Sequence, residues 1–400
     1  MIYDCIIIGA GPSGLMAAAQ LDKNLKVLII EKKSSAGNKL LLTGGGRCNV
    51  TNLKANKEFL DEVDYNKKFL YSAISKFGPK DIYNFFQSNG VALKEEVDNR
   101  IFPKSNKAQD ILKCLLKTTK HIQIKYEESL VNIMKEDYII IKTTKEKYRT
   151  KNLIIATGGA SFEHTGSSGE HIKFAKTIEQ PVIDLFPAEV GIVLNNYLDL
   201  AGISHENVNV VFDNKKTSGT LMFTHDGLSG ESIMKMSEHI FKSKNKNIKI
   251  DFIPNDTIEE IKGKINNFDR EKELLSFFNT MFQKRFSSYL IQKLAYNKKV
   301  KQLVKQEIDE IVKMLKECEF TVKCTKPLNT AYITGGGIDM NYINSTTMES
   351  TINSNIYFIG EALDIHGPVG GYNITLALST GALAASAINK KTRPLDFLNQ

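Results

Sequence analysis

The first thirty residues contain the feature that most constrains the fold of this chain. A continuous apolar run at 4–8 leads into the glycine-rich turn GAGPSG at 9–14, then a small-residue helix at 15–21. A second apolar run at 26–30 ends at Glu31. Continuous apolar runs of this length are typical of parallel strands buried on both faces. The order of strand, turn, helix and strand predicts a βαβ unit of a Rossmann-like α/β domain.

The residues of this turn suit the binding of a dinucleotide. Gly9 permits the tight turn, Gly11 lets the backbone approach a pyrophosphate, and Gly14 lets the helix lie close to the strand. The helix N-terminus offers free N–H groups and the positive end of a dipole. Glu31 can accept hydrogen bonds from both hydroxyls of a ribose. Because strand, helix and Glu31 all accompany the pattern, it predicts a cofactor with an ADP half.

Glycine clusters near the other end of the chain indicate a long cofactor. Thr157-Gly158-Gly159 follows an apolar run at 152–156, Gly360–Asp364 follows another at 356–359, and Gly370–Asn373 opens a small-residue helix at 374–388. NAD and FAD share the ADP half, but FAD adds a ribityl chain and a tricyclic ring that must be held along their length. Glu361 or Asp364 would suit the ribityl hydroxyls. The start of the last helix would direct N–H groups at the flavin's pyrimidine edge, where negative charge gathers on reduction.

The segment LLLTGGGRCNVTN at 40–52 is the second predicted contact with FAD. Its three glycines would let the main chain lie against the cofactor without Cβ atoms in the way. Arg47 would place a multi-donor cation beside the pyrophosphate or the electron-rich edge of the flavin, and Asn49 would add a hydrogen-bonding group. Cys48 is predicted to be a small buried residue, because no second cysteine lies close enough in sequence to form a redox pair.

The middle of the chain has a different texture from both ends. Residues 190–255 are β-rich, and 256–319 are helical, lysine-rich and poor in glycine. Strand-like, glycine-rich character returns at 331. The sequence therefore predicts an FAD-binding domain built from 1–189 and 331–400, interrupted by an insertion at 190–330. Within the first part, short β-rich runs at 122–126, 130–134 and 138–143 predict a meander leading into 152–156.

The amino-acid composition limits which binding partners and which cellular compartment we expect. The net charge is +8, but 47 of the 53 basic residues are lysines, and no stripe of alternating aromatic and basic residues is visible, which argues against nucleic acid. No apolar run approaches the roughly 20 residues of a membrane span. The N-terminus lacks the features of a secretory signal, and the five scattered cysteines form no CxxC pair. We expect a cytoplasmic protein with no membrane association and no metal site.

The chain resembles a known family, the two-dinucleotide-binding-domain flavoproteins. Within this family it is most similar to the BaiN-type NAD(P)/FAD-dependent oxidoreductases, which include aminoacetone oxidases. The resemblance is carried by GAGPSGLMAA (9–18), NKLLLTGGGRCNVTN (38–52), RIFPKSNKA (100–108), ATGGASF (156–162), FTHDGLSG (223–230), TGGGI (334–338) and GEALDIHGPVGGYN (360–373). It implies a glutathione-reductase-like FAD domain, with an insertion made of a small β-barrel-like part and a helical part. It also implies that the flavin lies against TGGGRCN and GGYN.

Motifs and resemblance together give the predicted cofactor-binding residues. They are Gly9, Gly11, Pro12, Ser13, Gly14, Glu31, Lys32, Lys39, Thr43, Gly44, Gly45, Gly46, Arg47, Cys48, Asn49, Val131, Ala156, Thr157, Gly158, Gly159, Gly337, Gly360, Glu361, Asp364, Gly371, Tyr372, Asn373 and Ile374.

The predicted function is an FAD-dependent oxidoreductase that NAD(P)H reduces and that acts on a small organic substrate or on oxygen. A flavin performs hydride chemistry itself, so the protein needs position, electrostatics and one proton donor. His225 is the candidate acid–base residue; the alternative is that it only packs the insertion. No second GxGxxG follows a strand in the insertion, so NAD(P)H would bind transiently near the flavin. An aminoacetone-type amine oxidase, an RNA-modifying flavoprotein and a non-catalytic flavin-binding protein stay open as alternatives.

Overall fold

The computed structural model describes residues 1–196 and 198–392 and divides the chain into two compact units. Unit 1 is Met1–Phe186 with Leu328–Gln400, and unit 2 is Pro187–Pro327. The predicted insertion at 190–330 thus starts and ends slightly later than unit 2. The end of the predicted range 331–400, from 393 onward, lies outside the described residues.

Unit 1 is built on a seven-stranded sheet with the order β6-β2-β1-β9-β8-β7, in which β18 also pairs with β9. The strands are β1 (Ile2–Ile8), β2 (Val27–Ile30), β6 (Gln123–Lys125), β7 (Leu130–Lys135), β8 (Ile139–Thr143), β9 (Lys147–Ile155) and β18 (Ile356–Phe358). β1 is parallel to β2 on one side and to β9 on the other. The expected α/β Rossmann-like fold is therefore confirmed.

Strand β9 connects two kinds of pairing. Its first half pairs with the antiparallel β8, with Thr150 opposite Ile139, and its second half pairs with the parallel β18, with Leu153 opposite Ile356. The C-terminal part of the chain thus adds a strand beside the end of β9.

The predicted meander is wrong for its first strand. β7, β8 and β9 do form an antiparallel meander, but β6 pairs in parallel with β2, with Ile29 opposite Ile124. The reason is that helix α6 (Ala108–Thr118) precedes β6. A helical crossover returns the chain in parallel, and the alternation pattern of a three-residue strand does not reveal this partner.

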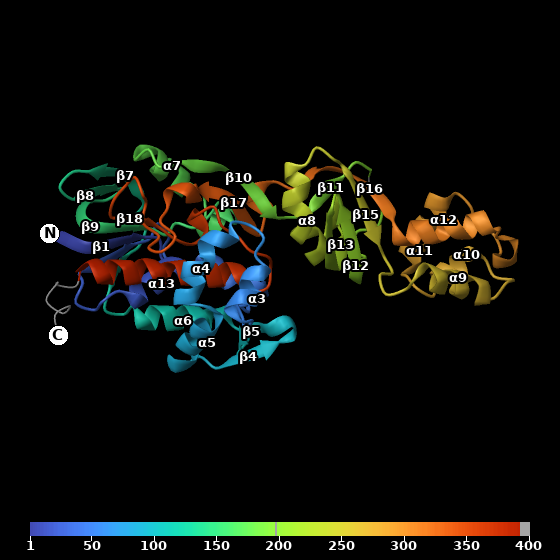
Figure 1. Ribbon diagram of the computed structural model, residues 1–400, viewed down its shortest axis with the longest axis horizontal. Coiled ribbons are helices and arrows are strands. Elements are labelled where there is room, and N and C mark those ends of the chain that lie inside the picture. The colour runs from blue at the N-terminus through green and yellow to red at the C-terminus, as the bar shows by residue number, and fades with distance from the viewer. Residues whose placement is uncertain (197, 393–400) are drawn as a thin grey trace. The chain divides into compact units, whose positions relative to one another are not determined.

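Helices and two small sheets surround the central sheet of unit 1 (Figure 1). The helices are α1 (Pro12–Gln20), α2 (Asn38–Leu42), α3 (Asn56–Asp61), α4 (Lys67–Lys76), α5 (Pro79–Ser88), α6, α7 (Glu170–Thr177) and α13 (Tyr372–Thr392). The small sheets are β3 (Thr51–Asn52) with β5 (Arg100–Pro103) and β4 (Leu93–Glu96), and β10 (Val182–Glu189) with β17 (Ile333–Ile338).

The first and last helices of unit 1 lie against each other. A Cβ at Gly381 of α13 would lie 2.4 Å from the carbonyl oxygen of Ser13, so this close approach requires glycine. Further along, the Asn389 amide donates to the carbonyl oxygen of Gln20 at 2.9 Å. The two ends of the chain therefore share one core.

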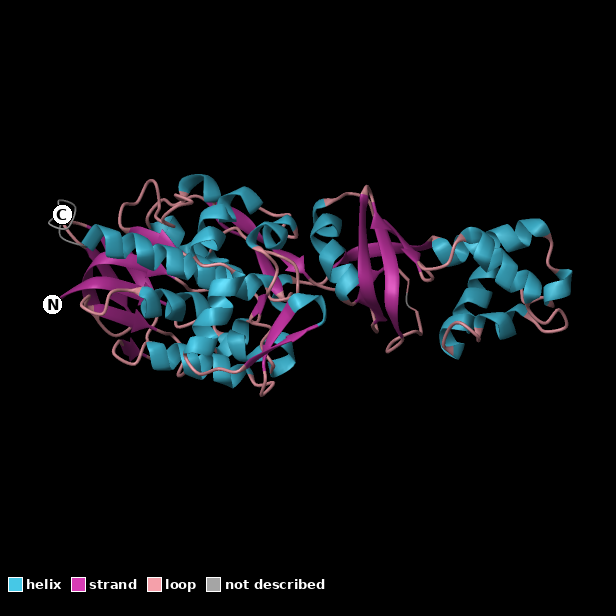
Figure 2. Ribbon diagram, turned by 60° about the horizontal axis from the view of Figure 1, so that its bottom comes forward, coloured by secondary structure: helices cyan, strands magenta, loops and turns pink. Residues whose placement is uncertain are grey.

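Unit 2 consists of a closed barrel and a group of helices (Figure 2). The barrel order is β11 (Ile192–Leu194), β14 (Gly227–Ser229), β13 (Lys215–Phe223), β12 (Ser204–Phe212), β15 (Asn247–Asp251) and β16 (Cys318–Thr325). The helices are α8 (Glu231–Lys242), α9 (Ile258–Asn267), α10 (Leu274–Phe278), α11 (Lys284–Leu294) and α12 (Lys305–Lys316). The barrel-like part implied by the resemblance is confirmed. Two details were not anticipated: α8 lies within the β-rich segment, and β16 closes the barrel after the helices.

Candidate cofactor site

The candidate site lies where three parallel strands of unit 1 end. β1 leads into Gly9, β9 into Ala156 and β18 into Ile359 and Gly360. Because parallel strands end at the same edge of a sheet, their loops lie side by side there, which is where α/β folds bind ligands.

Close backbone contacts join these loops. A Cβ at Gly9 would lie 2.4 Å from the carbonyl oxygen of Ala156, and one at Gly360 would lie 2.7 Å from the Ser13 hydroxyl oxygen. Gly9 and Gly360 also have φ of +106° and +64°, a region that favours glycine. The structure therefore brings the GAGPSG, ATGG and GEALD segments together.

Gly11 differs from its neighbours in the turn. A Cβ there would meet no heavy atom within 4 Å, so the backbone is open on that side. Gly11 is the N-cap of α1, and Pro12 opens the helix. The start of α1 is thus open beside Gly11, as the approach of a pyrophosphate requires.

Glu31 is held by backbone groups at the end of β2. One carboxylate oxygen accepts from Ala10 N at 2.8 Å and the other from Lys33 N at 2.8 Å. A carboxylate has about four acceptor positions. The Glu31 carboxylate is therefore oriented by the turn and keeps acceptor capacity.

The TGGG segment has an unusual backbone and lies against the start of α13. Gly44, Gly45 and Gly46 have φ of +56°, +66° and +84°, and Cys48 follows at +61°. A Cβ at Gly371 would lie 2.6 Å from the carbonyl carbon of Thr51 and 3.0 Å from Asn49 Oδ1. The TGGGRCN and GGYN motifs are thus in contact.

Arg47 is held by neighbouring protein groups. Its guanidinium pairs with Glu96 of β4, donates to Asn106 Oδ1 at 2.9 and 3.0 Å, and lies 4.1 Å from the centre of the Phe102 ring. The structure therefore shows Arg47 tying the TGGG segment to the β4–β5 hairpin. The predicted contact between Arg47 and the cofactor stays a prediction.

Cys48 is fully buried, and its thiol has no disulfide partner. Burial raises the pKa of this thiol to about 12, although the Thr43 hydroxyl acts in the opposite direction. The thiol is therefore protonated at neutral pH, as a packing residue would be. Thr43 itself donates to the Leu40 carbonyl oxygen at 2.6 Å.

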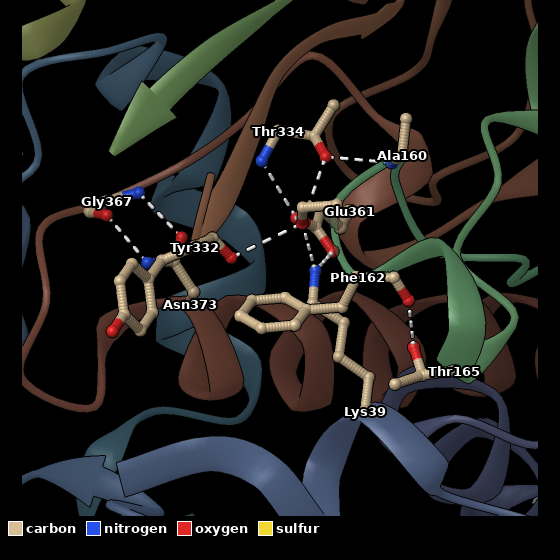
Figure 3. Close-up of polar contacts among 10 residues, drawn as sticks. Lys39, Ala160, Phe162, Thr165, Tyr332, Thr334, Glu361, Gly367 and Asn373 are labelled. Atoms are coloured by element: carbon tan, nitrogen blue, oxygen red, sulfur yellow. Dashed lines mark hydrogen bonds and ion pairs between the residues drawn. The ribbon is translucent and has the colours of Figure 1, made fainter. Parts of the chain in front are cut away.

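Lys39 and Glu361, both predicted to contact the cofactor, contact each other (Figure 3). The Lys39 ammonium lies 2.6 Å from Glu361 Oε2 and 2.7 Å from Ser161 Oγ. Lys32 behaves similarly and contacts Ser168 Oγ at 2.6 Å and Glu170 at 2.9 Å. Both lysines therefore fasten the segment that follows β9.

The last motif holds its own loop together. Asn373 donates to the Gly367 carbonyl oxygen at 2.7 Å and accepts from Gly367 N at 2.9 Å (Figure 3). The Tyr372 ring stacks on Phe59 with 4.5 Å between the ring centres, and its hydroxyl lies 3.3 Å from the Lys54 ammonium. Burial raises the pKa of Tyr372, although Lys54 opposes this.

The remaining predicted residues are not all in one place. Gly337 abuts the third loop, since a Cβ there would lie 2.7 Å from the Ala362 carbonyl oxygen, and Ile374 is in the first turn of α13. Val131 is on β7, which β8 separates from β9. His225 belongs to unit 2, where it is exposed between β13 and β14.

Sequence reasoning missed the residues that hold Asp364. The Tyr65 hydroxyl donates to Asp364 Oδ2 at 2.8 Å, and the Asn66 amide donates to the Asp364 carbonyl oxygen at 2.6 Å. The Tyr65 ring also stacks on His366, with 4.6 Å between ring centres. Tyr65 precedes an ordinary amphipathic helix and belongs to no motif, so its sequence carries no signal of this role.

The residues present fit FAD. Among the described residues, the buried atoms Asn49 Oδ1 and Thr157 Oγ1 have no hydrogen-bond partner. Buried polar atoms in proteins are normally satisfied, so these two are available to a bound group. They lie in the TGGGRCN and ATGG segments. Helix terminus, ribose-binding carboxylate and unpaired polar atoms are the set that a dinucleotide with a polar ring system needs.

Two further observations concern membrane helices and metal sites. Among residues 1–196 and 198–392, no helix has the length and apolar character that a membrane crossing needs. The same part of the chain contains no group of three or more His, Cys, Asp or Glu side chains placed to hold a metal ion.

Known proteins resemble this chain over nearly its full length. Residues 3–387 match the family described as HI0933-like protein Rossmann domain. The ribosomal RNA dihydrouridine synthase of Haemophilus influenzae is 29% identical over 401 residues, which are 96% of this chain and 98% of that protein. The 3-dehydro-bile acid delta(4,6)-reductase of Clostridium scindens is 26% identical over 405 residues, which are 95% and 98%.

A solved structure shares the fold. The 3-ketosteroid delta1-dehydrogenase of Sterolibacterium denitrificans superposes with a TM-score of 0.53 at 13% identity, over 98% of this chain and 100% of that one. The predicted resemblance to BaiN-type proteins is confirmed by the family match and by the bile-acid reductase. The chain therefore belongs to the HI0933-like Rossmann domain family of flavoprotein oxidoreductases.

Proposed function

We propose that this protein is an FAD-dependent oxidoreductase that NAD(P)H reduces and that reduces a carbon–carbon double bond conjugated with a carbonyl group. The observation that carries the FAD assignment is the convergence of three loops at the ends of β1, β9 and β18, with Asn49 Oδ1 and Thr157 Oγ1 unpaired among the described residues. FAD, when bound, supplies hydride transfer.

The substrate class follows from the names of the relatives. A dihydrouridine synthase saturates a double bond of uracil that is conjugated with a carbonyl, and a 3-dehydro-bile acid delta(4,6)-reductase acts on double bonds conjugated with a 3-oxo group. These substrates differ in size and polarity but share one reacting group. We assign the same reacting group to this chain because it matches both relatives over nearly its full length.

The residues have separate tasks in this proposal. The first turn of α1 binds the pyrophosphate across the open side of Gly11, and Glu31 binds the ribose. Asn49 and the start of α13 hold the pyrimidine edge of the flavin, where N–H groups stabilise the negative charge of the reduced ring. The sequence has no second GxGxxG after a strand, so NAD(P)H binds transiently at the same face.

The test begins with the purified protein. It should release FAD on denaturation, and NADH or NADPH should bleach its visible flavin absorption under anaerobic conditions. A 3-oxo-4-ene steroid or a simple enone should then restore the absorption as it is consumed. Aminoacetone-dependent peroxide formation, with no response to nicotinamides, would instead identify an amine oxidase.

A second candidate substrate is uridine within ribosomal RNA. It is suggested by the name of the H. influenzae relative and by a lysine cluster on the barrel. Lys244, Lys246 and Lys323 are exposed, and Val322 N donates to the Lys246 carbonyl oxygen at 2.6 Å, which brings the two segments together. Among the described residues, none of these lysines forms an ion pair, unlike Lys249 and Lys316 nearby.

The RNA candidate is tested by incubating the reduced enzyme with ribosomal RNA and measuring dihydrouridine. Replacing the three lysines by glutamine should weaken RNA binding and lower its salt dependence, because fewer phosphate contacts release fewer counterions. Turnover of a small enone should be unchanged. Dihydrouridine formation that ignores both salt and these substitutions would remove the lysine cluster from the proposal.

A further inference from the structure

One ion pair in unit 1 connects four separate segments of the chain. Lys39 comes from α2, Thr334 from β17 and Glu361 from the turn after β18 (Figure 3). Ser161 comes from the segment after β9. We call these four residues the Lys39–Glu361 network.

Protein groups use most of the hydrogen-bonding capacity of the Glu361 carboxylate. Oε2 accepts from Lys39 at 2.6 Å, while Oε1 accepts from Thr334 N at 3.0 Å and from Ser161 Oγ at 3.4 Å. A carboxylate has about four acceptor positions. Three of them are directed at protein donors, which leaves little for ribityl hydroxyls.

Within the network, the charge of Lys39 balances the charge of Glu361. Burial disfavours the charge on Glu361, but Lys39 and the backbone amides of Thr334 and Gly159 outweigh burial and lower its pKa. His171 is fully buried nearby, and burial lowers its pKa to about 4, against the pull of Glu361. His171 is therefore neutral at physiological pH, and Lys39 supplies the counter-charge.

The network also fixes the position of the ATGG segment. Ala160 N donates to Thr334 Oγ1 at 2.8 Å, and a Cβ at Gly159 would lie 2.4 Å from the same oxygen and 2.9 Å from Glu361 Cδ. Gly159 and Ala160 therefore rest directly on the network. Thr157, with its unpaired hydroxyl, is two residues before Gly159.

We propose that Glu361 is a positioning residue: paired with Lys39, it holds α2 and residues 157–159 in the arrangement that binds FAD, and it does not itself bind the ribityl chain. The inference rests on the proposed FAD binding. It assigns to the pair a joint role in place of two separate contacts with the cofactor.

A double-mutant cycle on FAD affinity tests this proposal. Lys39→Met leaves a carboxylate without its counter-charge, and Glu361→Gln leaves an ammonium without one, so each should weaken FAD binding by about tenfold or more. The double variant removes both charges. It should bind FAD about as well as either single variant, and not with the roughly hundredfold loss that independent contacts give.

The measurements are FAD titration of the apoprotein, the visible circular dichroism of the bound flavin, and thermal unfolding of the apoprotein. Additive losses in FAD affinity would overturn the proposal, as would a loss in Glu361→Gln that Lys39→Met does not share. Coupling that appears only in apoprotein unfolding would also overturn it, since that is a structural role alone.

Controls keep the result interpretable. Lys391 and Glu349 form a 2.7 Å ion pair elsewhere in unit 1, and the cycle Lys391→Met with Glu349→Gln should leave FAD affinity unchanged. If a charge variant fails to fold, Ser161→Ala removes one contact from each partner and should give a smaller loss in FAD affinity; no loss there counts against the proposal. If the wild-type protein binds FAD but NAD(P)H does not reduce the flavin, the proposed function is wrong. The double-mutant cycle on FAD affinity can still be interpreted in that case.

Discussion

Gly9 and Gly11 are two residues apart, yet they serve different purposes. The side of Gly9 is filled by Ala156, whereas a Cβ at Gly11 would meet no protein atom within 4 Å. Gly9 also has φ of +106°, while Gly11 has φ of −79°, which any residue can adopt. One glycine is required by the fold and the other is left open to a ligand.

This difference predicts opposite behaviour of two alanine variants. Gly9→Ala should lower the free energy of unfolding of the apoprotein by at least ~2 kcal/mol, because both its dihedrals and its contact are unfavourable. Gly11→Ala should change apoprotein stability by less than about 0.5 kcal/mol but weaken FAD binding. Denaturant unfolding and FAD titration measure the two effects. Equal loss of stability in both variants would contradict the assignment.

The sequence predicts which residues lie near the cofactor, but it does not predict which of them form ion pairs with each other. Lys39 and Glu361 were both expected at the cofactor, and nothing in the order of residues indicates that they neutralise each other, since they are far apart in the chain. Tyr65 was missed altogether. Its role depends on how the segment before α4 reaches Asp364, and that is a matter of tertiary packing.

Among the elements, the TGGG segment and the β4–β5 hairpin are held together by Arg47. The consecutive left-handed glycines are costly to order, because glycine loses more conformational freedom on folding than other residues. Contacts from Arg47 to Glu96, Asn106 and Phe102 offset this cost. The segment is thus ordered through a hairpin that contains none of the predicted cofactor-binding residues.

Because Arg47 joins the TGGG segment to the β4–β5 hairpin, we expect this contact to affect FAD affinity. Arg47→Ala should weaken FAD binding about tenfold or more. Glu96→Gln should weaken FAD binding by a smaller factor, because Asn106 and Phe102 still hold the guanidinium. FAD titration of the apoproteins measures both, with the exposed Arg149→Ala as control. If Arg47→Ala abolishes binding while Glu96→Gln has no effect, Arg47 acts on the cofactor directly.

Elements with strong local patterns were predictable and those defined by a distant partner were not. The βαβ unit at the N-terminus and the last helix follow from apolar runs and glycine spacing. β6 is three residues long, and its partner β2 is distant in sequence. β16 closes the barrel only after four helices, so its place follows from pairing with β11 and β15.

At the scale of the whole molecule, each unit has its own hydrophobic core. Buried residues of the barrel and its helices, such as Phe223, Phe252 and Phe286, form a cluster confined to unit 2. The two ends of unit 2 are also joined, because Lys326 N donates to the Gly191 carbonyl oxygen at 2.9 Å. An insertion whose ends meet can form without its host.

We therefore expect the fragment 187–327 to fold alone. It should unfold cooperatively on heating, with circular dichroism characteristic of mixed α and β structure, because its core and its chain ends are complete. The fragment 1–186 should not, since it lacks β18 and α13. A non-cooperative melt of 187–327 would show that unit 2 depends on unit 1.

The shared core of the first and last helices has a consequence for synthesis. A ribosome delivers the N-terminal fragment first, but the strand beside β9 and the helix that covers Ser13 follow unit 2 along the chain. Unit 2 is complete well before them. The insertion can thus fold while the first half of its host still waits for a partner, and chaperones would be needed most by this waiting segment.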